Sequence, residues 1–251
     1  MVEALQAEWI KIRRSKIWWS IVLLALLPVL YSILIYTKIM VEKLHYTGPD
    51  AWFMPWSLIV MFYGSVFYPI ISGLIATILC RFEHAGGGWK QILTLPVSKS
   101  HLYLSKLLWL LGLLAVVQGT TLILFVGLGY AFELDGSPPW SFLLASTLLG
   151  WIGGFPLVAL QQWIASSWKT FVIPMAINVF LVLPGFLIVA SELALKSPLG
   201  YLYPWTLPVM GMMESDPSGV DPLGSPFLPV TLLYLAMFLA GGLVTFHRRE
   251  F

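Results

Sequence analysis

Six apolar runs, each long enough to cross a lipid bilayer, dominate this sequence. A spanning helix needs about 20 consecutive, mainly apolar residues. The runs contain no Asp, Glu, Lys or Arg. Because every backbone polar group in lipid needs an internal partner, runs of this length favour α-helices. We therefore predict an all-α membrane protein, with residues 1–251 forming one six-span domain. The predicted spans are residues 17–36, 57–80, 107–132, 140–167, 171–190 and 227–246.

The composition agrees with a chain that is embedded in a lipid bilayer. Hydrophobic residues make up 59% and charged residues 10%, against roughly 45–50% and about 25% in ordinary soluble domains. The net charge of +2 is too small to indicate a nucleic-acid partner. The single cysteine, Cys80, has no disulfide partner in the chain and is interpreted as a small apolar packing residue.

Lys and Arg are sorted between the two sides of the predicted membrane. With both termini in the cytoplasm, eleven of the 14 basic residues lie on the cytoplasmic side and three lie outside. The reverse orientation would invert these numbers, against the rule that cytoplasmic loops are rich in Lys and Arg. We therefore predict a multi-pass protein with both termini cytoplasmic.

Residues 1–16 form an apolar stripe with helical spacing, followed by a basic cluster. The stripe consists of Val2, Leu5, Trp9 and Ile12. The basic residues are Lys11, Arg13, Arg14 and Lys16. One interpretation is an amphipathic helix on the inner leaflet with its basic face toward anionic headgroups. The other is that the charges only flank the first span, which obeys the same charge rule.

The longest polar interruption on the predicted cytoplasmic side is residues 81–106. Here Glu83 is followed by a glycine triplet, a short amphipathic piece and Pro96. Helices usually end before a proline, and Ser98 or Ser100 can cap a new helix after it. We interpret this segment as a docking surface for a soluble partner.

Motifs for catalysis are absent from the sequence. It contains no GxxxxGK[ST] phosphate loop, no HExxH, no GxSxG and no Cys/His cluster with metal-ligand spacing. We assign no catalytic residue, metal site or bound cofactor to this chain. The lack of charged residues inside the spans also disfavours an ion-coupled carrier. A permease driven by a separate ATPase chain would explain these features together.

Four amide side chains lie within the predicted spans. They are Gln118, Gln161, Gln162 and Asn178. Two interpretations stay open: the amides line a substrate path, or they form interhelical hydrogen bonds that each stabilise packing by about 1 kcal/mol. Small residues at 150, 153 and 154 permit a close helix contact in the fourth span.

Three stretches carry a family resemblance. They are Glu8 with Lys11, Arg13, Arg14 and Ser15; Glu83 with Trp89-Lys90, Leu93-Thr94-Leu95-Pro96-Val97-Ser98-Lys99 and Tyr103-Leu104-Ser105-Lys106; and Tyr203-Pro204-Trp205 with Pro208. In these stretches and in its six-span architecture, the chain resembles type-2 ABC export permeases, the membrane subunits of bacterial ATP-driven exporters. It is most similar to the permeases of bacitracin-resistance and lantibiotic self-protection transporters.

The resemblance implies a role for each of these stretches. It implies an N-terminal elbow helix, a cytoplasmic coupling helix from Glu83 to Pro96, and short re-entrant helices within residues 191–226 on the outer side. The implied elbow residues are Glu8, Trp9, Lys11, Arg13 and Arg14. The implied ATPase-coupling residues are Glu83, Trp89, Lys90, Leu93, Thr94, Pro96, Val97, Ser98 and Lys99.

The resemblance also implies partners and a function. The partners would be a cytoplasmic ABC ATPase that holds ATP and Mg²⁺, a second permease subunit of the same or a related chain, and the bilayer of the bacterial plasma membrane. The expected function is the expulsion of an amphipathic peptide antibiotic or a related compound. The alternative is a non-transporting scaffold or sensor subunit, which would neither stimulate nor depend on an ATPase.

Overall fold

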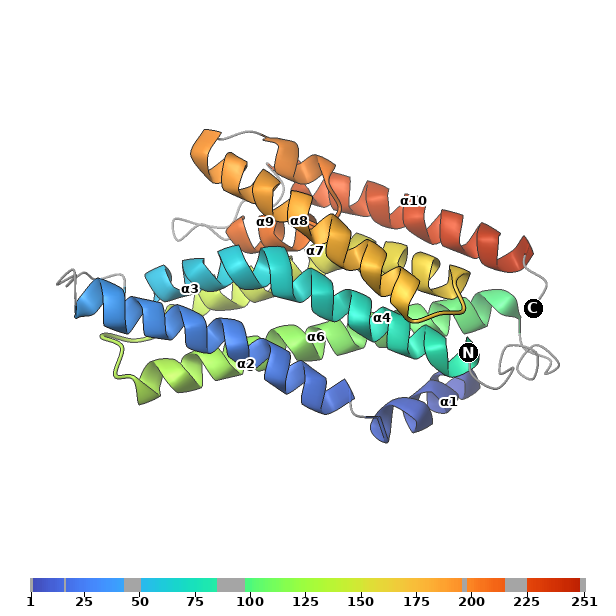
Figure 1. The fold of residues 1–251 in the computed structure, drawn as a ribbon, viewed down its shortest axis with the longest axis horizontal. Helices are drawn as coiled ribbons and strands as arrows, with labels where there is room; N and C mark the ends of the chain where they lie inside the picture. Colours follow the sequence, from blue (N-terminus) through green and yellow to red (C-terminus); the bar gives the residue numbers. More distant parts are fainter. Residues whose placement is uncertain are drawn as a thin grey trace.

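The computed structural model describes residues 2–15, 17–42, 51–84, 98–195, 198–214 and 225–248. Within these residues the regular secondary structure is entirely helical, and six helices are long and apolar enough to cross a membrane (Figure 1). They are Ile17–Ile39, Phe53–Glu83, Lys99–Ala131, Trp140–Ser167, Val172–Ser191 and Phe227–Arg248. The predicted fold class, an all-α six-span membrane protein, is confirmed.

The first two spans are composite. The chain begins with α1 (Val2–Arg13), a short helix that packs against the third span. The first span is α2 (Ile17–Ile35) with the π-helix η1 (Tyr36–Val41). The second span is α3 (Phe53–Ile59), the π-helix η2 (Val60–Phe67) and α4 (Tyr68–His84). The later spans are α6 (Lys99–Ala131), α7 (Trp140–Ser167), α8 (Val172–Leu195) and α10 (Phe227–Arg248).

Two spans begin earlier in the chain than the apolar runs predicted. Helix α6 begins at Lys99 instead of residue 107, because the Ser98 hydroxyl caps it by accepting from the His101 N–H at 3.3 Å. Ser98 is one of the two caps, Ser98 or Ser100, that the sequence offered for this helix. The second span begins at Phe53, since Pro55 stands in the first helical turn, where a missing N–H costs no helical hydrogen bond.

The π-helical part of the second span ends at Phe67, two residues before Pro69. In an α-helix, the ring of Pro69 would clash with the carbonyl of the residue four positions earlier, Ser65. The wider π turns of η2 cover Ser65 and stop at Phe67. The local sequence therefore explains why the helix changes its winding here. The Pro69 carbonyl accepts the side-chain hydrogen bonds from neighbouring helices that are described below.

Between α8 and α10 the chain contains two short helices, the 3₁₀-helix η4 (Pro198–Leu202) and α9 (Leu207–Met213). All but one of the α9 residues are buried, and α9 packs mainly on α7 (Figure 1). A Cβ atom on Gly153 would lie 2.3 Å from the Leu207 carbonyl oxygen, and one on Gly211 would lie 2.3 Å from the Leu149 carbonyl oxygen. The glycines of α7 thus allow a close helix contact, and its partner is α9. The re-entrant position of this segment in a membrane stays a prediction.

A serine on α7 fixes the end of α9. The Ser146 hydroxyl donates to the Met212 carbonyl at 2.9 Å and accepts from the Trp56 indole N–H at 2.9 Å. Carbonyls in the last turn of a helix lack helical partners and need such donors when they are buried. One hydroxyl therefore joins the second span, α7 and α9.

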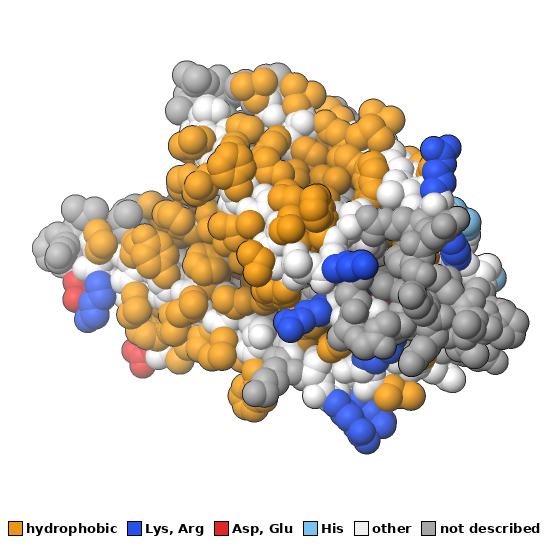
Figure 2. Space-filling model, turned by 45° about the vertical axis from the view of Figure 1, so that its right-hand side comes forward, with side chains coloured by type: hydrophobic (Ala, Val, Ile, Leu, Met, Phe, Trp, Pro, Cys, Tyr) orange, Lys and Arg blue, Asp and Glu red, His pale blue; other side chains and the backbone are white. Residues whose placement is uncertain are grey.

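Helix α1 and the C-terminal end of α10 lie at the same end of the bundle, which we call the basic end (Figure 1). The described basic residues on the elements at this end are Lys11, Arg13, Arg14, Arg81, Lys99, Lys106, Lys169 and Arg248. Among the described residues, Lys38 alone carries a positive charge at the opposite end. Figure 2 shows apolar side chains over the middle of one face, with Lys and Arg gathered beyond them at one end. This distribution agrees with the charge sorting seen in the sequence.

The contact between α7 and α9 can be tested with matched glycine variants. We expect Gly153→Ala to destabilise the protein by about 1–3 kcal/mol, because the added methyl group displaces α9. On α6, Gly112 has open space at its Cβ position, so Gly112→Ala should stabilise the helix by roughly 0.5–1 kcal/mol. Thermal unfolding of the detergent-purified variants measures both effects. Shifts of the same sign would contradict the close contact.

Candidate functional site

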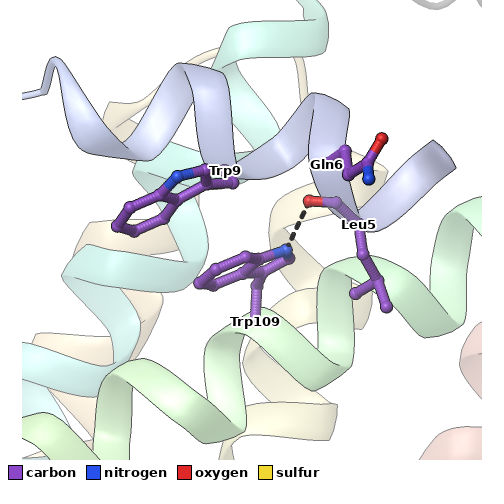
Figure 3. A pocket seen from close by; sticks show the side chains of 4 residues that line it. All are labelled: Leu5, Gln6, Trp9 and Trp109. Atoms are coloured by element: carbon purple, nitrogen blue, oxygen red, sulfur yellow. Dashed lines mark hydrogen bonds between the residues drawn. The ribbon is translucent and has the colours of Figure 1, made fainter. Parts of the chain in front are cut away.

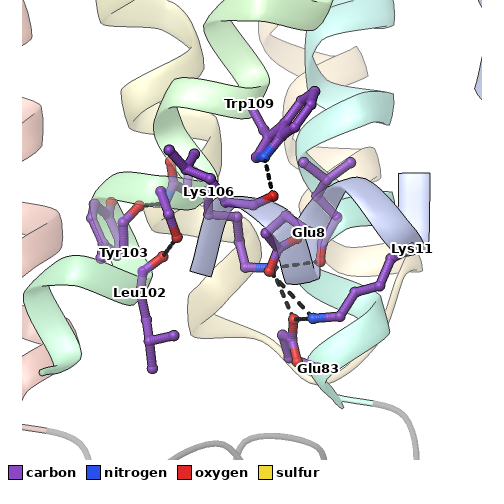
Figure 4. Close-up of polar contacts among 11 residues, drawn as sticks. Glu8, Lys11, Glu83, Leu102, Tyr103, Lys106 and Trp109 are labelled. Carbon is purple, nitrogen blue, oxygen red and sulfur yellow. Dashed lines mark hydrogen bonds and ion pairs between the residues drawn. The ribbon is translucent and has the colours of Figure 1, made fainter. Parts of the chain in front are cut away.

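Four charged side chains meet inside the basic end, between α1, α4 and α6 (Figure 4). We call this set the charge cluster; it consists of Glu8, Lys11, Glu83 and Lys106. The Lys106 ammonium lies 2.9 Å from a Glu8 carboxylate oxygen and 3.1 Å from a Glu83 carboxylate oxygen. Lys11 approaches the same oxygen of Glu83 at 2.5 Å and the same oxygen of Glu8 at 3.3 Å. The cluster thus contains two positive and two negative charges.

Burial makes this charge balance necessary. The exposed fractions are 5% for Glu8, 2% for Glu83 and 3% for Lys106. An ammonium group has three N–H donors, and the third acceptor for Lys106 is the Leu79 carbonyl oxygen on α4 at 3.1 Å. Buried charges are tolerated when they are paired and hydrogen-bonded. Removing one partner from such a set is therefore more damaging than removing an exposed ion pair.

Helical spacing brings each of these side chains to the cluster. On α1, Glu8 and Lys11 are three residues apart and share a face. On α6, Lys106 follows the buried Tyr103 by three residues and precedes the buried Leu110 by four. Next to the cluster, the Trp109 indole N–H donates to the Leu5 carbonyl at 2.9 Å. These contacts hold α1 against α6.

Glu83, which the resemblance implies is the first residue of a coupling helix, lies within α4 in the structure. Helix α4 continues through His84, and the buried Glu83 carboxylate points into the bundle. The reason is that Lys106 and Lys11 provide counter-charges there. Of the other predicted coupling residues, Trp89, Lys90, Leu93, Thr94, Pro96 and Val97 lie outside the described residues. Their coupling role stays a prediction.

The two remaining coupling residues begin α6. Ser98 caps the helix, and the Lys99 ammonium donates to the His247 carbonyl at 3.2 Å near the end of α10. The Ser100 hydroxyl also lies 3.2 Å from the His247 Nε2 atom. The start of α6 is thus attached to the end of α10. The end of α4 therefore carries the charge cluster, and the first residues of α6 contact the last span.

The predicted elbow residues divide into two groups. Glu8 and Lys11 enter the charge cluster, and Trp9 stacks on Trp109 with ring centroids 5.4 Å apart. Arg13 and Arg14 are exposed. The first group attaches α1 to the bundle, and the second leaves two positive charges at its surface.

Two of the four amides meet at the Pro69 carbonyl. Gln161 on α7 and Asn178 on α8 donate to this oxygen at 3.1 and 2.9 Å, and Gln161 also donates to the Asn178 carbonyl oxygen at 2.8 Å. The Trp205 indole N–H donates to the same Asn178 oxygen at 2.9 Å. The network joins α4, α7, α8 and the segment before α9.

The other two amides make separate contacts. Gln118 on α6 accepts from the Tyr63 hydroxyl at 3.3 Å, and Gln162 on α7 donates to the Tyr103 carbonyl at 2.9 Å. All four amides are buried in this conformation. Their contacts are interhelical hydrogen bonds, the second of the two interpretations of the sequence.

Sequence reasoning missed the burial of Lys106 and the contacts of Trp109. One signal was available: Glu8 lies three residues after Leu5 and four before Ile12, so it interrupts an apolar helical stripe with a negative charge. A carboxylate on the buried face of a helix requires a cation partner. The sequence could not show which helix supplies it. Within the described residues, no group of three or more His, Cys, Asp or Glu side chains could hold a metal ion.

The fold and its charge distribution define a multi-pass integral membrane protein whose buried charges hold its helices together at one end. The chain matches the family model described as ABC-2 family transporter protein over residues 4–185, well over half of its 251 residues. It belongs to this family. None of the curated proteins matches the chain. The protein is therefore a membrane permease subunit of an ABC transporter, a component distinct from the ATPase.

The energetic weight of the charge cluster can be measured by removing its central cation. We expect Lys106→Met to destabilise the protein by about 3–5 kcal/mol, because it leaves two buried carboxylates close together with less compensation. Lys169→Met removes the same charge from an exposed position at the same end and should change the stability by less than about 0.5 kcal/mol. Denaturant unfolding in detergent measures both. A similar small effect for the two variants would show that the cluster is not an energetic unit.

The amide network predicts a dependence between two positions. A Cβ atom on Gly73 would lie 2.2 Å from the Asn178 amide nitrogen. We expect Gly73→Ala to destabilise the protein by about 1–3 kcal/mol through overpacking. In an Asn178→Ala background the same change should add little, since the clashing group is gone. A double-mutant cycle of unfolding free energies tests this, and additive effects would contradict it.

Proposed function

We propose that this permease exports an amphipathic compound, with a peptide antibiotic as the substrate class, and that a separate ATPase docks on residues 81–106 to drive it. Membrane subunits of this family generally work with an ATPase partner. The observation that carries the proposal is the charge cluster, because it joins α1 to both helices that flank residues 85–97. A force applied to that segment would reach three helices at once.

The distribution of charge supports the orientation that docking requires. The basic end carries all but one of the described Lys and Arg residues, and cytoplasmic loops of membrane proteins are rich in these residues. We place the basic end in the cytoplasm of a bacterial cell, where an ATPase holding ATP and Mg²⁺ could reach it. The sequence itself has no phosphate loop.

The proposed cycle begins with closure of two ATPase subunits, one on each of two permease chains. The permeases would be identical or related and would pack around a central route. In each permease chain, the charge cluster would transmit movement of the docking segment, residues 81–106, to α1, α4 and α6 together. The four amides would reach a substrate only if the helices that bury them move apart, so their role in a substrate path requires a second conformation.

The test is reconstitution with ABC ATPase subunits from the same cell and measurement of ATP turnover with cationic amphipathic peptides. We expect Glu83→Gln to lower peptide-stimulated turnover about tenfold or more, because a loss of about 1.4 kcal/mol in coupling corresponds to a factor of ten. Glu42→Gln is the matched control, since Glu42 makes an exposed ion pair with Lys38 at the opposite end. That variant should retain wild-type turnover.

The outcomes separate the proposal from its alternative. A stable complex whose peptide stimulation is lost in Glu83→Gln but kept in Glu42→Gln supports an ATP-driven exporter with the cluster as its coupling device. If the complex forms and both variants respond to peptide like the wild type, the cluster has only a structural role. If no ATPase binds, the chain is better explained as a scaffold or sensor subunit.

A further inference from the structure

An apolar cleft lies between α1 and α6, on the outside of the bundle (Figure 3). It is lined by Leu5, Gln6, Trp9 and Trp109. The first three come from one face of α1, and Trp109 comes from the facing side of α6 (Figure 3). Gln6 is exposed, and the Trp9 side chain remains 41% exposed although it stacks on Trp109. The site is therefore a surface recess open to whatever surrounds the protein.

The aromatic walls of the cleft are fixed by contacts on several sides. The Trp109 N–H donates to the Leu5 carbonyl at 2.9 Å, so the indole polar atom is already satisfied. Trp9 stacks on Trp109 with an interplanar angle of 10° and meets Trp18 on α2 edge to face, with centroids 6.4 Å apart. A preformed apolar recess of this kind can bind an acyl chain without the free-energy cost of ordering the side chains that line it.

A positive charge stands on the same helical face. Arg13 follows Trp9 by four residues and Gln6 by seven, spacings that place the three on one side of a helix. Arg14 follows Trp9 by five residues and falls off this side. Among the residues that the structure describes, Glu8 and Glu83 pair with Lys11 and Lys106, and Arg13 makes no ion pair. A phosphate group could therefore pair with Arg13.

We propose that the cleft binds one anionic phospholipid of the surrounding leaflet, with an acyl chain against Trp9 and Trp109 and the phosphate beside Arg13. The position of the cleft relative to the membrane suits a lipid, because α1 forms it directly before the first span, which begins at Ile17. Because acyl chains are as apolar as the cleft, their contacts with it distinguish little between lipids. The headgroup therefore decides which lipid binds, through the contact of its phosphate with Arg13.

The experiment is native mass spectrometry of the full chain in a mild detergent, with phosphatidylglycerol or phosphatidylcholine carrying identical chains. It needs no ATPase and is therefore independent of the transport proposal. We expect the wild type to retain one phosphatidylglycerol in preference to phosphatidylcholine. Arg13→Gln should reduce this retention about fivefold, the effect of one interfacial cation. Arg14→Gln, which removes the neighbouring charge, should retain the lipid. Gln6→Phe should reduce retention by filling the cleft.

A second readout avoids substitutions altogether. Phosphatidylglycerol with brominated acyl chains should quench part of the tryptophan emission of the wild type, and this quenching should saturate near one lipid per protein. Brominated phosphatidylcholine should show no such saturable quenching. The proposal is overturned if the two lipids bind equally, or if Arg13→Gln and Arg14→Gln lose lipid to the same extent. It is also overturned if Gln6→Phe leaves lipid retention unchanged but converts a dimer to a monomer, since a second copy would then occupy the cleft.

Discussion

The burial of Lys106 is the constraint on which the basic end depends. Its ammonium group has three hydrogen-bond donors, and the structure provides an acceptor from α1, one from the side chain of Glu83 and one from the α4 backbone. A lone ammonium at this depth would be strongly unfavourable, so the three helices must meet at this point. The ion pairs therefore specify an arrangement of helices that apolar packing, which is not directional, would leave less defined.

In the middle of the bundle, close packing and hydrogen bonds join the helices in place of ion pairs. Between apolar helices in lipid, association depends on close packing and hydrogen bonds, since the lipid itself is equally apolar. Gly153 lets the α9 backbone approach α7, and Gly73 makes room for the Asn178 amide. The absence of a Cβ atom at these positions is thus part of the folding information. The Pro69 carbonyl then accepts from two amides, in a region where an unpaired polar group would be costly.

The features that could be predicted from the sequence are local ones. Apolar runs of spanning length identified the six helices, and the possible caps Ser98 and Ser100 indicated where α6 begins, because a cap acts over three residues. The charge cluster joins residues that are 98 and 23 positions apart, so no local pattern could pair Glu8 or Glu83 with Lys106. The small residues of α7 predicted a close contact but not its partner, because α9 is too short to be recognised by its periodicity.

The charge cluster and the amide network both contact α4, at opposite ends of this helix. The cluster attaches α1 and α6 to the basic end of α4, while the amide network attaches α7 and α8 to Pro69 at its start. The π-helix η2 precedes α4 and ends at Phe67, and π winding is often found at functional sites in helices. Polar contacts therefore hold α4 near both of its ends, and the change of winding lies directly before its first residue, Tyr68. If the docking segment moves α4, the bend of the second span is expected at η2, next to the α9 contact made by Gly64.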